Sequence, residues 1–316
     1  MHVPTLLARL ALGMAAALAV GAAAQAQAPN VTAAEAPDQT FAVAGPDGAP
    51  MQAGVWLPAG RSPGEAAPLV VISHGNGGWY RGHEDLARAL AEAGFLVASL
   101  THPHDNFEDQ SGATRLTDRP GHLRRLVDHM AGEWRGPVEV DAGRIGAFGF
   151  SAGGFTVTSA IGGRSDPQAI LQHCREHPDF FACRLLAIQP LEAARWRNTE
   201  ADPRIRAAVI AAPAFGFAFS AESLGAVTIP VQLWQAAEDE ILPRPHNVEP
   251  IRDRLGRAPD YRLVDRARHY DFLPPCAPRL AEIQPALCTS AEGFDRAAFH
   301  REMNREVVAF FREALG

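Results

Sequence analysis

The segment at residues 144–161 restricts the possible folds of this chain more than any other. It begins with an apolar run, as expected of a strand buried in a sheet, and it ends in a run that suits a helix. Gly149-x-Ser151-x-Gly153 lies between the two runs. A serine in so sharp a turn needs neighbours without a Cβ, because strand and helix pass close to each other there. The segment predicts a serine hydroxyl held clear of the sheet at a helix N-terminus, where the helix dipole favours developing negative charge.

A glycine-rich turn with an incidental serine is the alternative. The presence or absence of catalytic partners for Ser151 distinguishes the two interpretations. A serine hydroxyl becomes a nucleophile when a histidine accepts its proton and a carboxylate orients that histidine. In an open α/β sheet such groups lie just beyond the carboxyl ends of strands. Asp239 follows a strand-like run at 229–235, and His269 follows a shorter one at 260–264. We therefore predict Ser151, Asp239 and His269 as a catalytic triad, in the chain order of the α/β-hydrolases.

Competing residues surround two of these positions. Glu238 and Glu240 flank the predicted acid, and a solvated acidic loop is the alternative there. Further candidates for the base are His102, His104 and His246. His102-Pro103-His104-Asp105 has the composition of a metal site, but no second cluster completes it, and we interpret it as a structural loop. We expect no metal and no cofactor.

An acyl-transfer site also needs two backbone N–H groups directed at one point. Ala152, the residue after the nucleophile, is expected to supply one. Asn76 is expected to supply the other, because it lies in a glycine-rich loop directly after the predicted strand at 68–73. Trp79 and Tyr80 follow this loop and are candidates for the wall of the substrate pocket, with ordinary packing as the alternative.

Strands alternate with helices along most of the chain. Expected strands lie at 40–44, 53–57, 68–73, 95–100, 205–211, 229–235 and 260–264, and expected helices at 84–92, 118–134, 244–255 and 295–315. This order predicts an α/β fold, with a mostly parallel sheet covered by helices on both faces, in one domain at 40–316. Residues 163–203 break the alternation with two helical pieces, 167–176 and 178–188. We interpret them as a cap over the site; a helical excursion packed on the body is the alternative.

The start of the chain has the pattern of a secretory signal. A short apolar, alanine-rich run follows Arg9, and small residues around position 26 suit a cleavage site. We predict a signal peptide at 1–26 and a mobile lead-in at 27–39, hence a periplasmic or secreted protein without a membrane anchor after cleavage; an uncleaved anchor is the alternative. The formal charge of −7 gives no indication of a nucleic-acid partner. All 29 basic residues are arginine, which excludes lysine chemistry such as Schiff bases.

Export makes disulfides plausible for the four cysteines. Each cysteine has one close neighbour in the sequence, so we expect Cys174–Cys183 and Cys276–Cys288. Sequence alone leaves the other two pairings open. The short C-x-x-C spacing of a zinc site is missing.

Taken together, these residues resemble the α/β-hydrolase superfamily over about residues 40–316. They are similar, more closely, to secreted bacterial proteins identified as predicted dienelactone hydrolases, which are related to platelet-activating-factor acetylhydrolases. The resemblance rests on 74–78, 101–103, 149–154, Asp239, 269–272 and the Cys276/Cys288 tail. Two features depart from those relatives: Ser151 stands where well-known dienelactone hydrolases have cysteine, and the acid follows a later strand than in the acetylhydrolases.

The resemblance implies a cofactor-independent esterase that acts on a small-molecule ester through an acyl-enzyme. A serine peptidase of the same superfamily is one alternative. A binding protein that has kept the scaffold without catalysis is the other.

Overall fold

The computed structural model describes residues 35–316. The predicted signal peptide and most of the predicted lead-in lie outside the described residues. The strands are β1 (Gln39–Ala44), β2 (Pro50–Trp56), β3 (Ala66–Ser73), β4 (Leu96–Leu100), β5 (Glu139–Phe150), β6 (Ile205–Ala211), β7 (Val231–Ala236) and β8 (Asp260–Val264). The helices are α2 (Glu84–Glu92), α3 (Arg119–Asp128), α4 (Ala152–Ala160), α5 (Pro167–Glu176), α6 (Phe181–Ile188), α7 (Ala221–Gly225), α8 (Val248–Arg254), α9 (Pro278–Ile283), α10 (Pro285–Cys288) and α11 (Arg296–Leu315).

The described strands form one eight-stranded sheet in the order β1-β2-β4-β3-β5-β6-β7-β8. Strand β2 is antiparallel to both of its neighbours, β1 and β4. The other neighbouring strands, from β4 through β3 to β8 at the far edge, pair in parallel. The mostly parallel sheet predicted from the sequence is therefore confirmed. Because parallel strands end at the same edge, the loops after β3, β5, β7 and β8 converge there, and these loops carry the predicted site residues.

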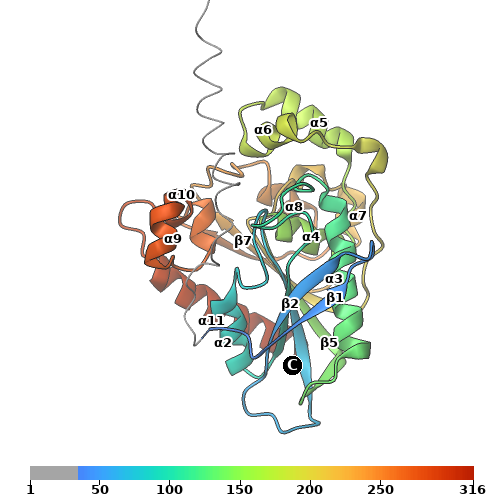
Figure 1. Ribbon diagram of the computed structural model, residues 1–316. Coiled ribbons are helices and arrows are strands. Elements are labelled where there is room, and N and C mark those ends of the chain that lie inside the picture. Colours follow the sequence, from blue (N-terminus) through green and yellow to red (C-terminus); the bar gives the residue numbers. More distant parts are fainter. Residues whose placement is uncertain (1–34) are drawn as a thin grey trace, which may run out of the picture.

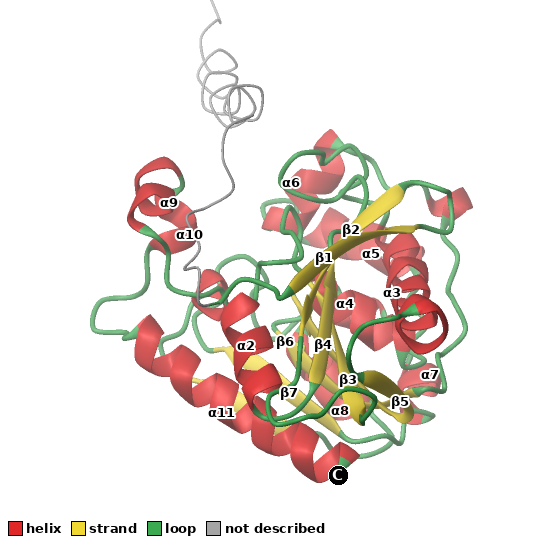
Figure 2. Ribbon diagram, turned by 60° about the horizontal axis from the view of Figure 1, so that its bottom comes forward, coloured by secondary structure: helices red, strands yellow, loops and turns green. Residues whose placement is uncertain are grey.

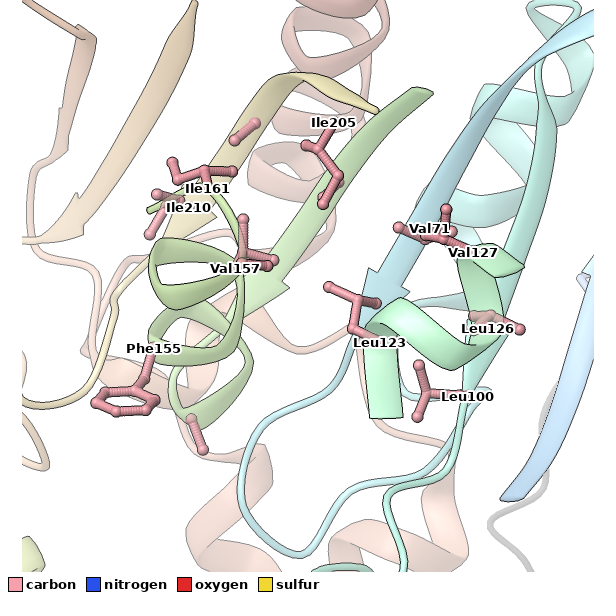
Figure 3. Close-up of a cluster of buried hydrophobic side chains, with 14 of the residues drawn as sticks. Val71, Leu100, Leu123, Leu126, Val127, Phe155, Val157, Ile161, Ile205 and Ile210 are labelled. Atoms are coloured by element: carbon pink, nitrogen blue, oxygen red, sulfur yellow. The ribbon is translucent and has the colours of Figure 1, made fainter. Parts of the chain in front are cut away.

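Helices cover both faces of the sheet (Figures 1 and 2). On one face, α2 and α11 pack on the sheet through buried side chains that include Leu86, Leu90, Val307 and Phe311. On the other face, α3 and α4 pack on it through the cluster shown in Figure 3, to which Leu123, Leu126, Phe155 and Val157 belong. Within residues 35–316, no helix combines the length and the apolar character that a membrane span requires.

Several helix boundaries differ from the sequence prediction. Helix α3 ends at Asp128, and the chain continues through a π-helical turn, His129–Glu133. Helix α6 begins at Phe181, after a turn that contains Pro178. Helix α8 begins only at Val248, because two prolines occupy 243–245 and a proline inside a helix removes a backbone donor.

The insert at 163–203 contains α5 and α6, which lie together at one end of the molecule (Figure 1). A disulfide between Cys174 and Cys183 joins the two helices, with an S–S distance of 1.99 Å. A second disulfide, Cys276–Cys288, joins α10 to the segment before α9. Both bonds have the pairing that was expected from the sequence.

Candidate active site

The loop after β5 holds Ser151 in a conformation that few residues adopt. Its φ of 57° and ψ of −117° lie outside the ordinary regions for a non-glycine residue. Its backbone is bonded on both sides, because its N–H donates to the carbonyl of Ala211 at 2.9 Å and its own carbonyl accepts from the N–H of Ala214 at 3.0 Å. The surrounding structure thus maintains the strained turn that directs the side chain away from the sheet.

The flanking glycines are required by close backbone approaches. A Cβ on Gly149 would lie 2.1 Å from the carbonyl oxygen of Gly153, and a Cβ on Gly153 would lie 1.9 Å from that of Ser73. Both distances are far below van der Waals contact, and the obstacles are backbone atoms that no rotamer change can remove. The spacing of glycine around Ser151 therefore follows from how closely β3, β5 and α4 pack.

The three predicted triad residues meet beside this turn. The hydroxyl of Ser151 lies 3.0 Å from Nε2 of His269, as required for donation to the imidazole. Nδ1 of the same ring lies 2.8 Å from Oδ2 of Asp239. The side chains of Asp239 and His269 are 3% and 2% exposed, so water does not compete for their hydrogen bond.

The acidic run after β7 places only one of its carboxylates on the imidazole. The other oxygen of Asp239 accepts the backbone N–H groups of Ile241 and Leu242 at 3.0 and 2.7 Å, which fixes the carboxylate in one orientation. Glu240 instead accepts the backbone N–H of His269 at 3.3 Å. The geometry therefore distinguishes Asp239 from its neighbours.

A short helical turn, His269–Phe272, carries the imidazole and is held in place by the side chain of Asp271. The carboxylate of Asp271 is fully buried, accepts the N–H of Arg268 at 2.8 Å and pairs with Arg296 at 2.9 Å. Asp271 thereby connects the turn that carries the imidazole to α11.

The two residues predicted to donate backbone N–H groups, Ala152 and Asn76, line the same pocket as Ser151. Ala152 begins α4, and Asn76 lies in the loop after β3. The N–H of Gly77 donates to Asp105 at 3.0 Å and that of Gly78 donates to the carbonyl of Gly75 at 3.1 Å. The N–H of Asn76 has no such partner among the described residues, so this amide remains available to a ligand.

Comparison with known proteins adds information on the fold. No protein-family model and no curated protein matches the chain, but solved structures do. A puromycin-hydrolysing peptidase of Mycobacterium tuberculosis matches with a TM-score of 0.58 and 16% identity, over 92% of this chain and 41% of that one. The esterase Pf2001 of Pyrococcus furiosus matches with a TM-score of 0.55 and 14% identity, over 92% of this chain and 98% of that one.

A putative dipeptidyl aminopeptidase IV from Bacteroides ovatus also matches, with a TM-score of 0.55 and 15% identity, over 89% of this chain and 36% of that one. The chain has the α/β-hydrolase fold. It spans less than half the length of the two peptidases. At these identities the similarity establishes the fold alone.

The α/β-hydrolase sheet of this protein adjoins an apolar pocket closed partly by the insert. Helix α6 supplies Phe181, Ala182, Leu185 and Leu186, and the body supplies Phe215 and Leu242 among others. The complete lining is Asn76, Ala113, Thr114, Leu116, Ser151, Ala152, Phe181, Ala182, Leu185, Leu186, Leu191, Ala214, Phe215, Ile241 and Leu242. No charged side chain is present in this lining. The insert thus contacts the same space as the Ser151 hydroxyl.

The two aromatic residues proposed for the pocket from the sequence do not line it. The ring of Trp79 packs on Phe107 with centroids 5.4 Å apart. The ring of Tyr80 lies over β2, so close that a Cβ on Gly54 would meet it at 2.7 Å. This corrects the sequence prediction: both rings pack on the body, and α6 supplies the aromatic and aliphatic wall instead.

A buried ion pair that the sequence analysis missed supports the Asn76 loop. Arg119, at the start of α3, pairs with Asp105 and also donates to the carbonyl of His74. The other oxygen of Asp105 accepts from the side chain of Asn76 at 2.7 Å and from the N–H of Gly77. Both charged side chains are at most 3% exposed. No sequence pattern indicates this pair, because Asp105 lies in a loop and Arg119 precedes a proline at the start of a helix.

The competing histidines lie elsewhere. His102 is buried in a network in which it contacts Ser73 at 2.8 Å and His122 at 3.2 Å. Burial, followed by the nearby Arg119 guanidinium, lowers the pKa of His102 well below its ordinary value and that of His122 to about 4. His104 is partly exposed and pairs with Asp109. The two histidines of the 102–105 stretch therefore lie in different surroundings, and neither contacts the triad.

Proposed function

We propose that this protein is a serine hydrolase that cleaves carboxylic esters. One observation carries the proposal: the continuous chain of hydrogen bonds from Ser151 through His269 to Asp239, at 3.0 and 2.8 Å, beside an uncharged pocket. Such a chain makes an otherwise weak hydroxyl nucleophilic.

The reaction begins when Ser151 Oγ attacks the ester carbonyl and Nε2 of His269 accepts the hydroxyl proton. The charge that develops on the imidazole is stabilised by Asp239, whose carboxylate is already oriented by two backbone N–H groups. The imidazolium then donates its proton to the departing alkoxide, which leaves as the alcohol. A water molecule attacks the acyl-enzyme with His269 again as the base, and Ser151 is regenerated with the free acid.

The tetrahedral intermediates carry a negative oxygen that needs preorganised donors. The N–H groups of Ala152 and Asn76 are assigned this role, aided by the N-terminus of α4. Loss of one such donor typically costs about 10²–10³ in kcat.

The uncharged pocket favours an ester of an apolar carboxylic acid. A peptidase of this fold is the second candidate, because the puromycin-hydrolysing peptidase is among the structures this chain resembles. The wall from α6 offers no charged side chain to a peptide terminus, which favours the ester. The resemblance to predicted dienelactone hydrolases and platelet-activating-factor acetylhydrolases also belongs to this proposal.

A periplasmic or secreted location is part of the same proposal. Two disulfides support it, since such bonds persist in oxidising compartments. The predicted signal peptide agrees with it. The proposed partner is a small ester rather than a nucleic acid.

A direct test compares p-nitrophenyl esters of increasing acyl length with the matching p-nitroanilides. We expect ester turnover, and its loss by at least about 10³-fold in Ser151→Ala. Ser159→Ala, on the same helix, is the matched control and should retain turnover. Labelling by a fluorophosphonate at Ser151 separates an active hydrolase from a silent scaffold, and preferential anilide cleavage would identify a peptidase.

A further inference from the structure

Three histidines meet on the side of the insert, outside the triad. His173 lies in the last turn of α5, and His177 is the residue directly after the helix, where its N–H donates to the carbonyl of His173 at 2.8 Å. His246 comes from the loop between β7 and α8. The candidate ligand atoms of the three rings all lie within 4.8 Å of one another. Elsewhere in residues 35–316, no other group of three potential ligands is so close.

From this cluster we infer a zinc site that joins the insert to the hydrolase body through His173, His177 and His246. Neutral imidazoles are preferred ligands of Zn²⁺, and three of them with a fourth water ligand make a complete tetrahedral set. An ion at the centre of a triangle with sides of 4.8 Å lies about 2.8 Å from each ligand atom, and small side-chain rotations bring this to the about 2.0–2.1 Å that zinc requires.

The rings are free to bind a metal. Among the described residues, no hydrogen bond is made by any ring nitrogen of the three. Metal binding by imidazole uses the lone pair of a ring nitrogen that carries no proton and has no other partner.

Aromatic rings pack against two of the three histidines. The ring of His173 stacks on Phe217 with centroids 3.9 Å apart, and that of His177 stacks on Phe180 at 4.7 Å. The disulfide at Cys174 holds the end of α5 against α6 and, being oxidised, offers no thiolate. The three rings are therefore held near one another, and imidazole nitrogens are the donors that the cluster provides.

An ion bound by the three histidines would link the insert to the loop after β7. His246 follows Leu242, a pocket residue, by four positions, and Leu242 donates its N–H to Asp239. The disulfide connects α5 to α6, and side chains of α6 line the pocket. An ion at the three histidines would therefore fix the insert against the loop that begins at the proposed catalytic acid. The site itself does not depend on whether Ser151 is catalytic.

The test is Zn²⁺ binding by tag-free protein, stripped with a chelator and titrated by calorimetry at pH 7.5. We expect one equivalent to bind to the wild type, with a thermal midpoint raised by several degrees. His177→Gln and His246→Gln, both at partly exposed positions, should weaken binding by at least about 100-fold. His129→Gln, a partly exposed histidine paired with Glu133, is the control and should bind as the wild type does.

Co²⁺ provides a second measurement on the same proteins. A tetrahedral site gives intense visible absorption that should be present in the wild type and in His129→Gln and absent from His177→Gln. If the wild type binds no Zn²⁺, or if the two ligand variants bind it as tightly as His129→Gln does, the cluster is a packed group of histidine and phenylalanine rings and the inference is overturned. Far-ultraviolet circular dichroism verifies that each variant is folded.

Discussion

Nδ1 of His269 lies 2.8 Å from Oδ2 of Asp239, with both side chains almost fully buried. Because Nδ1 donates to the carboxylate, the neutral ring presents an unprotonated Nε2 to Ser151. Replacing Asp239 by Asn would leave the shape nearly unchanged but would favour the wrong tautomer. We expect Asp239→Asn to lower kcat for a p-nitrophenyl ester by about 10³–10⁴-fold with little change in unfolding free energy.

Glu240→Gln is the matched control for that experiment. Within residues 35–316, the one hydrogen bond of the Glu240 side chain is from the backbone N–H of His269, and glutamine retains an acceptor oxygen. Its kcat should stay within about tenfold of the wild type. Equal losses in the two variants would show that the charge of the loop, rather than the contact of Asp239 with the ring, supports catalysis.

The backbone around the elbow makes a prediction about stability. A Cβ on Gly153 would lie 1.9 Å from the carbonyl of Ser73, so Gly153→Ala forces α4 away from β3. We expect this change to lower the unfolding free energy by about 3 kcal/mol, the upper part of the usual range for overpacking, measured by urea denaturation. Gly132→Ala is the control, because a Cβ there meets nothing within 4 Å and its backbone is not in the left-handed region. An unchanged stability in Gly153→Ala would contradict the described packing.

The features predicted correctly from the sequence are those that depend on local patterns. Apolar runs predicted the strands, and the ends of β6, β8 and α5 agree with the prediction. The serine, the acid and the histidine are far apart in the chain, but each was expected in a loop after a strand. Loops that follow parallel strands converge at one edge of the sheet, so the meeting of the three residues could be predicted. The disulfide pairing followed from nearness in the sequence.

The features that were missed depend on contacts between segments with no shared pattern. Arg119 and Asp105 each have an ordinary local sequence, and only the fold brings them together. The aromatic pair after the Asn76 loop was a reasonable pocket wall until the path of the insert was known. His173 and His177 have the spacing of a helical metal site, but the third histidine comes from another loop.

The buried pair of Arg119 and Asp105 predicts a loss of both stability and activity. Arg119→Met leaves the carboxylate of Asp105 buried without its cation, which typically costs about 3–5 kcal/mol. Asp105 also holds Asn76 and Gly77 through hydrogen bonds. We therefore expect kcat to fall even without denaturant, by more than the loss of folded protein accounts for. The double variant Arg119→Met/Asp105→Asn should recover part of the unfolding free energy in urea. A double variant as unstable as the single one would show that the charge of Asp105 is not the cause.

His83 predicts how stability changes with acid. Its ring is 2% exposed, lies against Phe148 and Phe150, and has no hydrogen-bond partner at either nitrogen among the described residues. Burial lowers its pKa to about 4, against an ordinary value near 6.5. Between these values the unfolded chain binds a proton that the folded protein does not, so stability falls as the pH falls from about 6.5 to about 4.

A variant without the titrating ring isolates this contribution. One pKa unit corresponds to about 1.4 kcal/mol, so the loss attributable to His83 approaches roughly 3 kcal/mol at pH 4. We expect His83→Phe to lose less unfolding free energy than the wild type between pH 7.5 and pH 5, as measured by urea denaturation at each pH. The difference should already reach about 2 kcal/mol at pH 5, because most of the titration of the unfolded chain is complete there. Parallel loss curves for the two proteins would mean that other groups, such as His74 and His102, whose pKa values burial also lowers, account for the acid sensitivity.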